Sequence, residues 1–130
     1  MSQPERTEQQ LAAVADRERD VFLRAGAGTG KTTVLVDRFC AAALDPEGGV
    51  ERILAFTFTE RAADQLRRRV REELIERARE ASGERLEALR EAQAATDRAW
   101  ISTIHAFCRR LLAAHPAAAG LDPRFRVVDE

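Results

Sequence analysis

A glycine-rich loop carries the residues of this chain whose types and spacing most clearly indicate chemistry. It is the run Ala25-Gly26-Ala27-Gly28-Thr29-Gly30-Lys31-Thr32-Thr33, and Lys31 is the single lysine among 21 basic residues. The run departs from the phosphate-loop pattern G-x-x-x-x-G-K-[ST] only at Ala25. Glycines let a backbone wrap around an anion, and the compact ammonium of lysine suits phosphate. Lys31 is expected to reach the β- and γ-phosphates, and the Thr32 hydroxyl to coordinate Mg²⁺. The loop therefore predicts binding of nucleotide phosphates.

The segments on either side of the loop are those that such a motif requires. The apolar run Val21–Leu23 predicts a first strand at about Val21–Ala25, and the apolar residues after Thr33 predict a helix to about Leu44. The start of that helix adds unpaired N–H groups and the positive end of the helix dipole, and both favour an anion. In this context a glycine-rich turn that binds nothing is the weaker interpretation.

Strands and helices alternate along the rest of the chain. Apolar spacing and turn residues predict a buried strand at Ile53–Thr57, an amphipathic helix at Glu60–Ala81, a helix at Glu84–Ala95, a short strand at Trp100–Ser102 and a helix capped by Thr103 that runs through Ala114. Thr7 and Gln10 predict a further helix start ahead of the first strand. The alternation predicts an α/β fold with a parallel sheet flanked by helices.

Length and composition limit the classes of protein to which the chain can belong. At 130 residues one domain at most is expected, and much of its 45% hydrophobic content is alanine, so the core should be thin. The net charge of −1 gives no overall basic field for nucleic acid, although local patches can still bind one. No apolar run approaches the roughly 20 residues that span a membrane, and no signal peptide is recognised. We therefore expect no membrane association and a cytoplasmic location.

The cysteines and the arginine-rich segment have simple interpretations. Cys40 and Cys108 lie on apolar faces of predicted helices without metal-site spacing, so both are expected to be buried free thiols. The cluster Arg67–Arg69 and Arg71 is followed at once by glutamates, which is typical of a solvated helix face with i,i+4 ion pairs. Neither feature predicts a metal site or a nucleic-acid patch.

Two turns after predicted strands carry hydroxyls beside an aromatic or imidazole side chain. Thr57-Phe58-Thr59 follows the second strand, and Thr103-Ile104-His105 follows the third. In open α/β sheets ligands bind beyond the carboxyl ends of the strands, where hydroxyls can hold phosphate and a ring can stack on a base. The same residues also suit a helix cap with a core phenylalanine, or a histidine at a helix start. Their pattern alone leaves both interpretations open.

Taken together, these segments resemble the UvrD-like superfamily 1 DNA helicases over nearly the whole chain. Gln10 matches the glutamine that reads the adenine edge in that family, and Ala25 to Thr33 match its phosphate loop, including the alanine at the first position. Arg38 falls where the family places a further nucleotide contact. The resemblance implies ATP and Mg²⁺ as cofactors and a P-loop NTPase (RecA-like) fold.

The DNA-contacting motifs of the same family are also recognisable. Ala55–Thr59, with the alanines and leucine that follow, looks like its motif Ia, and Thr103-Ile104-His105 is similar to its motif Ib. Phe107-Cys108-Arg109 and the segment Asp122–Glu130 lean toward the AddA and RecB branch. The resemblance implies contacts from Thr57, Phe58, Thr59, Thr103 and His105 to single-stranded DNA. It also implies that a possible partner is the second protein of a helicase–nuclease complex.

The family also needs groups that this chain is not expected to supply. An acidic Asp-Glu pair on a later strand holds Mg²⁺ and activates water, and arginines come from a second RecA-like domain. Asp129-Glu130 is not expected to be that pair, because the family's pair is followed by Gln-Asp. Residues 1–130 are therefore expected to be the incomplete N-terminal portion of the helicase ATP-binding domain 1A.

Three functions are weighed on this basis. The first is ATP hydrolysis coupled to translocation on, or unwinding of, DNA in recombination and repair, by a longer parent protein. The second is an inactive remnant that binds nucleotide or DNA. The third is another P-loop enzyme such as a small-molecule kinase, which would need an acceptor site within this length.

Overall fold

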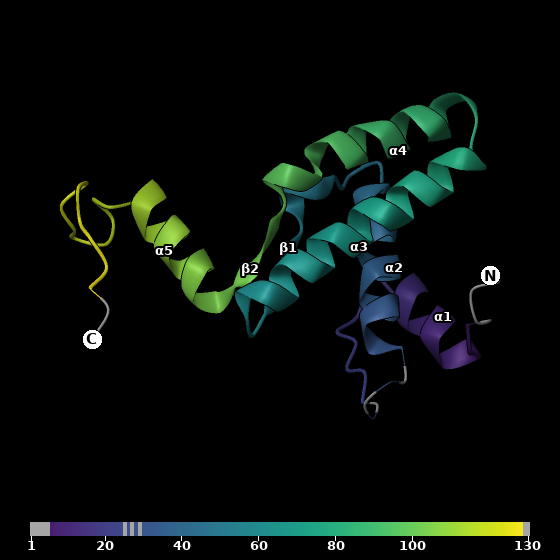
Figure 1. Ribbon diagram of the computed structural model, residues 1–130, viewed down its shortest axis with the longest axis horizontal. Helices are drawn as coiled ribbons and strands as arrows, with labels where there is room; N and C mark the ends of the chain where they lie inside the picture. Colours follow the sequence, from purple (N-terminus) through teal and green to yellow (C-terminus); the bar gives the residue numbers. More distant parts are fainter. Residues whose placement is uncertain (1–5, 25, 27, 29, 129–130) are drawn as a thin grey trace.

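The computed structural model describes residues 6–24, 26, 28 and 30–128. Its elements in chain order are α1 (Glu8–Ala15), α2 (Lys31–Ala43), the 3₁₀ turn η1 (Val50–Arg52), β1 (Leu54–Thr57), α3 (Glu60–Arg79), α4 (Gly83–Ala95), the 3₁₀ turn η2 (Thr96–Arg98), β2 (Trp100–Thr103) and α5 (Ile104–Ala114). Figure 1 shows α3 and α4 as an antiparallel pair, with α2 crossing α3, α1 beside α2, and α5 leading away from the other helices.

The helices form where local sequence predicts them. Thr7 and Gln10 make the expected capping box, since the Thr7 hydroxyl accepts from the Gln10 N–H at 3.3 Å and the Gln10 side-chain oxygen accepts from the Thr7 N–H at 3.0 Å. Thr59 and Thr103 cap α3 and α5 with their hydroxyls, which accept from the Ala62 and Ala106 N–H groups. The predicted helix bounds agree with the observed ones to within about two residues, the usual uncertainty of helix ends.

The two strands of the described sheet are parallel neighbours, which confirms the α/β class and the parallel pairing. Ala55 pairs with Ile101, and Phe56 with Ser102. Ala55 and Ile101 are buried on the face that α3 covers, whereas Leu54 and Phe56 on the other face are 44% and 43% exposed. The expectation that the second strand is buried is therefore wrong for this face, which the Phe107 ring of α5 covers in part, with its centroid 5.0 Å from that of Phe56.

The predicted first strand is not formed in the residues that the structure describes. Val21 to Arg24 pair with no neighbour there, and Phe22 is 90% exposed. Ala25, the expected last residue of that strand, lies outside the described residues. A strand completes its hydrogen bonds only with a neighbouring strand, whereas a helix completes them within itself. A short apolar run is therefore not sufficient to form a strand.

One core joins α2, α3 and α4 to the covered face of the sheet. Its buried members are Val36, Phe39, Cys40, Val50, Ala55, Ala63, Leu66, Val70, Leu74, Leu89, Ala92, Ala99 and Ile101. Cys40 is a free, fully buried thiol in this cluster, as expected. Cys108 is exposed, so the expectation of a second buried thiol is wrong. The reason is that α5 packs on little besides β2 and buries none of its residues.

Candidate functional site

The described part of the glycine-rich loop has the backbone that an anion site requires. Gly28 and Gly30 have φ angles of +75° and +83°, a region that side chains with a Cβ rarely adopt. Gly30 is the N-cap of α2, and its carbonyl accepts the first helical hydrogen bond from Val34 at 3.0 Å. The exposed start of α2 therefore points its N–H groups at the loop.

Lys31 folds back over this loop. Its Nζ donates to the Gly26 carbonyl oxygen at 2.9 Å, so the ammonium lies above the backbone that precedes it. Thr32 is exposed in the first turn of α2, and Thr33 is half-buried. Ala25, Ala27 and Thr29, which the sequence also assigns to the loop, lie outside the described residues.

The donor set at the loop fits a magnesium–triphosphate group. The described residues contain no cluster of three His, Cys, Asp or Glu side chains suited to a metal. Mg²⁺ does not need one here, because it keeps several waters and binds substrate phosphates with only one or two protein oxygens. The exposed Thr32 hydroxyl next to Lys31 could supply such an oxygen.

Gln10 lies directly against the loop, although twenty residues separate the two in sequence. A Cβ atom added to Gly30 would lie 3.2 Å from the Nε2 atom of Gln10. The same side chain also closes the capping box of α1. The structure thus brings the predicted adenine-reading residue and the predicted phosphate loop together.

Arg38 lines a cavity of about 220 Å³ together with Lys31, but its guanidinium bonds to α1. Its NH1 nitrogen donates to the backbone carbonyls of Ala13 at 2.6 Å and Asp16 at 2.5 Å, at the C-terminal end of α1. The sequence assigns Arg38 to the nucleotide, and the structure places its guanidinium on the helix that carries Gln10. Its predicted contact with the nucleotide stays a prediction.

Asp37 is a buried charge that the sequence reasoning missed. It is 7% exposed, and its two carboxylate oxygens accept from Arg6 and from Arg77, each at 2.8 Å. Burial alone would lower the pKa of Arg77, but its hydrogen bond to Glu73 and the nearby Asp37 raise it. The signal in the sequence is a carboxylate among the apolar residues of α2, because a buried carboxylate requires cationic partners.

The turn after β1 has a helix cap and an exposed ring. The Thr59 hydroxyl accepts from the Ala62 N–H at 3.1 Å, and the Thr57 hydroxyl donates to the Thr59 carbonyl at 3.0 Å. Phe58 is fully exposed at the tip of this turn. The helix-cap interpretation is confirmed for Thr59, but its core phenylalanine is not, since Phe58 touches no core.

The turn after β2 is joined to the first turn by a side-chain hydrogen bond. The Thr103 hydroxyl donates to the Glu60 carboxylate at 2.8 Å. The Thr103 hydroxyl oxygen also accepts from the Ala106 N–H at 3.2 Å. A cavity of about 440 Å³ is lined by Glu60, Thr103, the exposed His105 and Arg109. Both predicted DNA-contacting segments therefore lie at the carboxyl edge of the two strands. Nothing in their sequence spacing indicated the role of Glu60.

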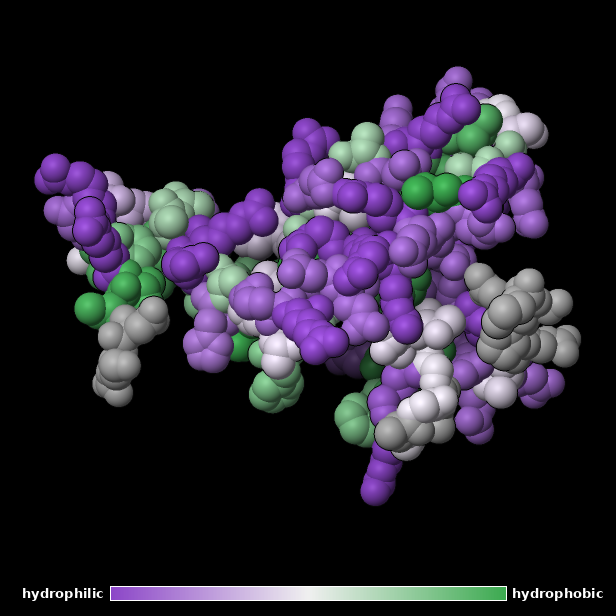
Figure 2. Space-filling view, in the orientation of Figure 1, coloured by the Kyte–Doolittle hydropathy of each residue, from purple (hydrophilic) through white to green (hydrophobic). Residues whose placement is uncertain are grey.

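The arginine cluster on α3 makes structural contacts. Arg67 donates to the Ile101 carbonyl at 2.7 Å and pairs with Asp64, and Arg71 pairs with Asp97. Figure 2 shows hydrophilic side chains over most of the visible surface of α3 and α4. The interpretation as a solvated, ion-paired helix face is confirmed in part: the described ion pairs of Arg67 and Arg71 are with Asp64 and Asp97, and not the predicted i,i+4 pairs with the following glutamates.

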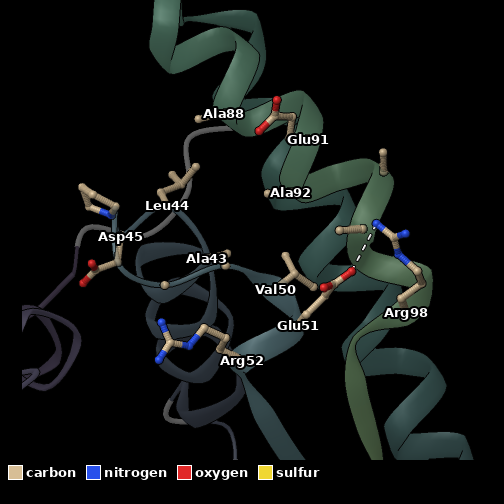
Figure 3. Close-up of a pocket in the computed structure, with 15 residues that line it drawn as sticks. Ala43, Leu44, Asp45, Val50, Glu51, Arg52, Ala88, Glu91, Ala92 and Arg98 are labelled. Carbon is tan, nitrogen blue, oxygen red and sulfur yellow. Dashed lines mark ion pairs between the residues drawn. The ribbon is translucent and has the colours of Figure 1, made fainter.

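A further cavity lies at the far end of α2. It has a volume of about 690 Å³ and is lined by the segment between α2 and η1 and by alanines of α4, with the Glu51–Arg98 ion pair at 3.3 Å on its wall (Figure 3). α2 has 13 residues, so this cavity lies about 18 Å along the helix from Lys31. It is therefore separate from the loop.

None of the helices in the described residues combines the length and apolar composition needed to cross a lipid bilayer.

Comparison with known proteins identifies the family of this chain. The sequence model of the protein family described as UvrD/REP helicase N-terminal domain matches residues 6–130. The chain is 46% identical over 127 residues to an ATP-dependent helicase/nuclease subunit of Pelotomaculum thermopropionicum, covering 95% of this chain and 10% of that protein. It is 43% identical over 125 residues to the protein of the same name from Moorella thermoacetica, with 95% and 9% covered. It is 41% identical over 132 residues to the protein of the same name from Desulforudis audaxviator, and the match covers 100% of this chain and 11% of that protein.

These matches confirm the resemblance to the UvrD-like helicases and its leaning toward the AddA branch. The chain spans about a tenth of the length of the relatives that it matches. The matched segment includes the described part of the loop, both turns at the carboxyl edge and the helix that carries Gln10. The chain belongs to the UvrD/REP helicase N-terminal domain family.

Proposed function

We propose that this chain binds Mg·ATP at its glycine-rich loop and single-stranded DNA at the carboxyl edge of its strands, as the N-terminal part of domain 1A of an ATP-dependent DNA helicase/nuclease. The observation that carries the proposal is the meeting of Gln10 with the loop. A phosphate loop alone is compatible with many enzymes, but a loop with an amide against Gly30 provides contacts for the phosphates and for the base.

Each loop residue has a distinct part in the proposed binding. The N–H groups at the start of α2 and the glycine backbone hold the phosphate oxygens, and Lys31 places its charge near the γ-phosphate. Lys31 must then exchange its hydrogen bond to Gly26 for one to phosphate. Thr32 would hold Mg²⁺, which when bound neutralises charge on the β- and γ-phosphates.

Single-stranded DNA is proposed to lie across the two turns after β1 and β2. Phe58 offers a fully exposed ring, which suits stacking on a base of any sequence. Thr103 and the exposed imidazole of His105 line the cavity after β2, and His105 suits a phosphate contact. The hydroxyls of Thr57, Thr59 and Thr103 would have to exchange their present hydrogen bonds for bonds to phosphate. The Glu60–Thr103 hydrogen bond keeps both turns in one arrangement.

ATP hydrolysis and DNA movement are proposed for the longer protein. Phosphoryl transfer depends on positioned charge around the γ-phosphate, which in this family includes an acidic pair and arginines from a second RecA-like domain. For the 130-residue chain by itself we propose binding, with the second protein of a helicase/nuclease complex as a partner of the longer protein.

Calorimetric titration of the 130-residue chain with Mg·ATP tests the first half of the proposal. We expect saturable binding that falls at least about tenfold in Lys31→Ala, because a charge-assisted hydrogen bond to phosphate contributes about 1.5–3 kcal/mol. The matched control is Arg90→Ala, the same loss of one exposed cation on α4. No binding, or equal binding by the Lys31 variant, would refute the proposal.

Fluorescence anisotropy with a labelled oligothymidylate tests the second half. We expect the chain to bind the single strand more tightly than a duplex of the same length. Equal affinity for both, or transfer of phosphate to a small acceptor without DNA, would favour a different P-loop protein.

A further inference from the structure

Two adjacent residues of α2 hold the two ends of α1. Ahead of the N-cap Thr7, Arg6 donates to Asp37 at 2.8 Å. At the other end, Arg38 donates to the carbonyls of Ala13 and Asp16 at 2.6 and 2.5 Å. We call Asp37 and Arg38 the clamp, together with the contact of Asp37 with Arg6 and the contacts of Arg38 with the end of α1.

The clamp matters because α1 is a short helix with few buried side chains among the described residues. The helix has eight residues, a length at which an isolated helix is marginal in water. Ala13 is its one buried residue, while Leu11 is 55% exposed. Burial of one alanine removes little apolar surface from water. The charged contacts at both ends therefore add to the packing that fixes α1 on α2.

The contact of Arg38 suits the end of α1 that it holds. The guanidinium of Arg38 meets carbonyls at the negative end of the helix dipole, where a cation is favourable. Asp37 in turn is held by Arg77 of α3, so the clamp is anchored in the core of the domain.

The clamp sets the position of Gln10 relative to the loop. Gln10 lies in the first turn of α1 and approaches Gly30, the last residue before Lys31. A small rotation of α1 about α2 would carry the Gln10 amide away from Gly30 while leaving the loop itself unchanged. The phosphate contacts and the base contact are thus separable.

We propose that Asp37 and Arg38 are positioning residues for base selection, and that Arg38 acts through α1 without touching the nucleotide. The inference rests on the proposed function, in which Gln10 reads the base. It differs from the expectation drawn from the sequence, which assigns Arg38 to the nucleotide directly.

A double-mutant cycle between Gln10 and Arg38 tests this inference. The dissociation constants of Mg·ATP, Mg·GTP and magnesium tripolyphosphate are measured for the unsubstituted chain, Gln10→Ala, Arg38→Ala and the double variant. We expect each single variant to lower the preference for ATP over GTP about 2- to 10-fold, the value of a neutral hydrogen bond. The double variant should have the same base preference as Gln10→Ala alone, because the effects of coupled residues are not additive. The affinity for tripolyphosphate, which has no base, should stay within about twofold in every variant.

The outcomes separate the inference from the proposed function. An unchanged base preference in Arg38→Ala would overturn the inference but not the proposed function. The same holds if the double variant loses the product of the two single losses, because independent effects indicate that Arg38 contacts the nucleotide directly. An unsubstituted chain without preference for ATP would refute the role of Gln10 and the inference with it. Arg38→Gln, which keeps the stem and one amide donor, gives the same cycle if Arg38→Ala does not fold. Arg90→Ala should retain the full preference.

Discussion

Alkaline pH is expected to destabilise the folded chain through Cys40, the thiol at the centre of the core. Cys40 is fully buried on α2, and burial raises its pKa from 9.0 to about 12. In the unfolded chain the thiol ionises from pH 9.0 upward, while in the folded chain it stays neutral until about 12. Stability is therefore complete below pH 9.0 and falls progressively as the pH rises toward 12.

The size of the effect follows from this pKa difference. Each pH unit between the two pKa values costs about 1.4 kcal/mol of unfolding free energy. Between about pH 8 and about pH 10.5 the loss is thus about 2 kcal/mol, a large share of the roughly 5–15 kcal/mol of a typical domain. The chain has no tyrosine and one lysine, so few other side chains titrate in this range.

Urea unfolding at the two pH values, followed by circular dichroism, measures the effect. Cys40→Ala leaves a small cavity that costs stability at both pH values, so the comparison is between the pH-dependent losses. The Ala variant should lose about 2 kcal/mol less than the unsubstituted chain between about pH 8 and about pH 10.5. Cys108→Ala, which removes the exposed thiol, should keep the full loss. An equal loss with and without Cys40 would refute the reasoning.

Three further predictions follow from the site and the core. Asp37→Asn should lower the free energy of unfolding by about 2–3 kcal/mol, because it removes the buried negative charge that accepts from both Arg6 and Arg77. Asp97→Asn, at an exposed pair, should cost less than about 1 kcal/mol in the same urea assay, and equal costs would contradict the assigned burial. Thr32→Ala should make ATP affinity insensitive to Mg²⁺, and calorimetry with and without the metal decides this. Phe58→Ala should weaken oligothymidylate binding about 5- to 150-fold through lost stacking, without change in melting temperature. Phe22→Ala removes another exposed ring, and a similar loss of DNA affinity there would count against a specific role for Phe58.

The helices were predictable because their signals are local. Thr7, Thr59 and Thr103 each cap the helix that the apolar spacing after them predicts, since the bond from each hydroxyl reaches only three residues along the chain. The strand at Val21 failed because its pairing depends on a neighbour elsewhere in the chain. For the same reason the exposure of Leu54, Phe56 and Cys108 was not predictable, because exposure depends on which helix covers a face.

The chemistry of the loop was also specified locally. Glycines followed at once by Lys31 and Thr32 indicate phosphate binding wherever a helix begins there, because the backbone N–H groups and both side chains come from one segment. The tertiary structure decided which distant residues join that segment. Gln10 reaches Gly30, and Arg38 turns to α1, only because α1 packs across α2. Contacts between elements arise from packing, which residue spacing along one element does not encode.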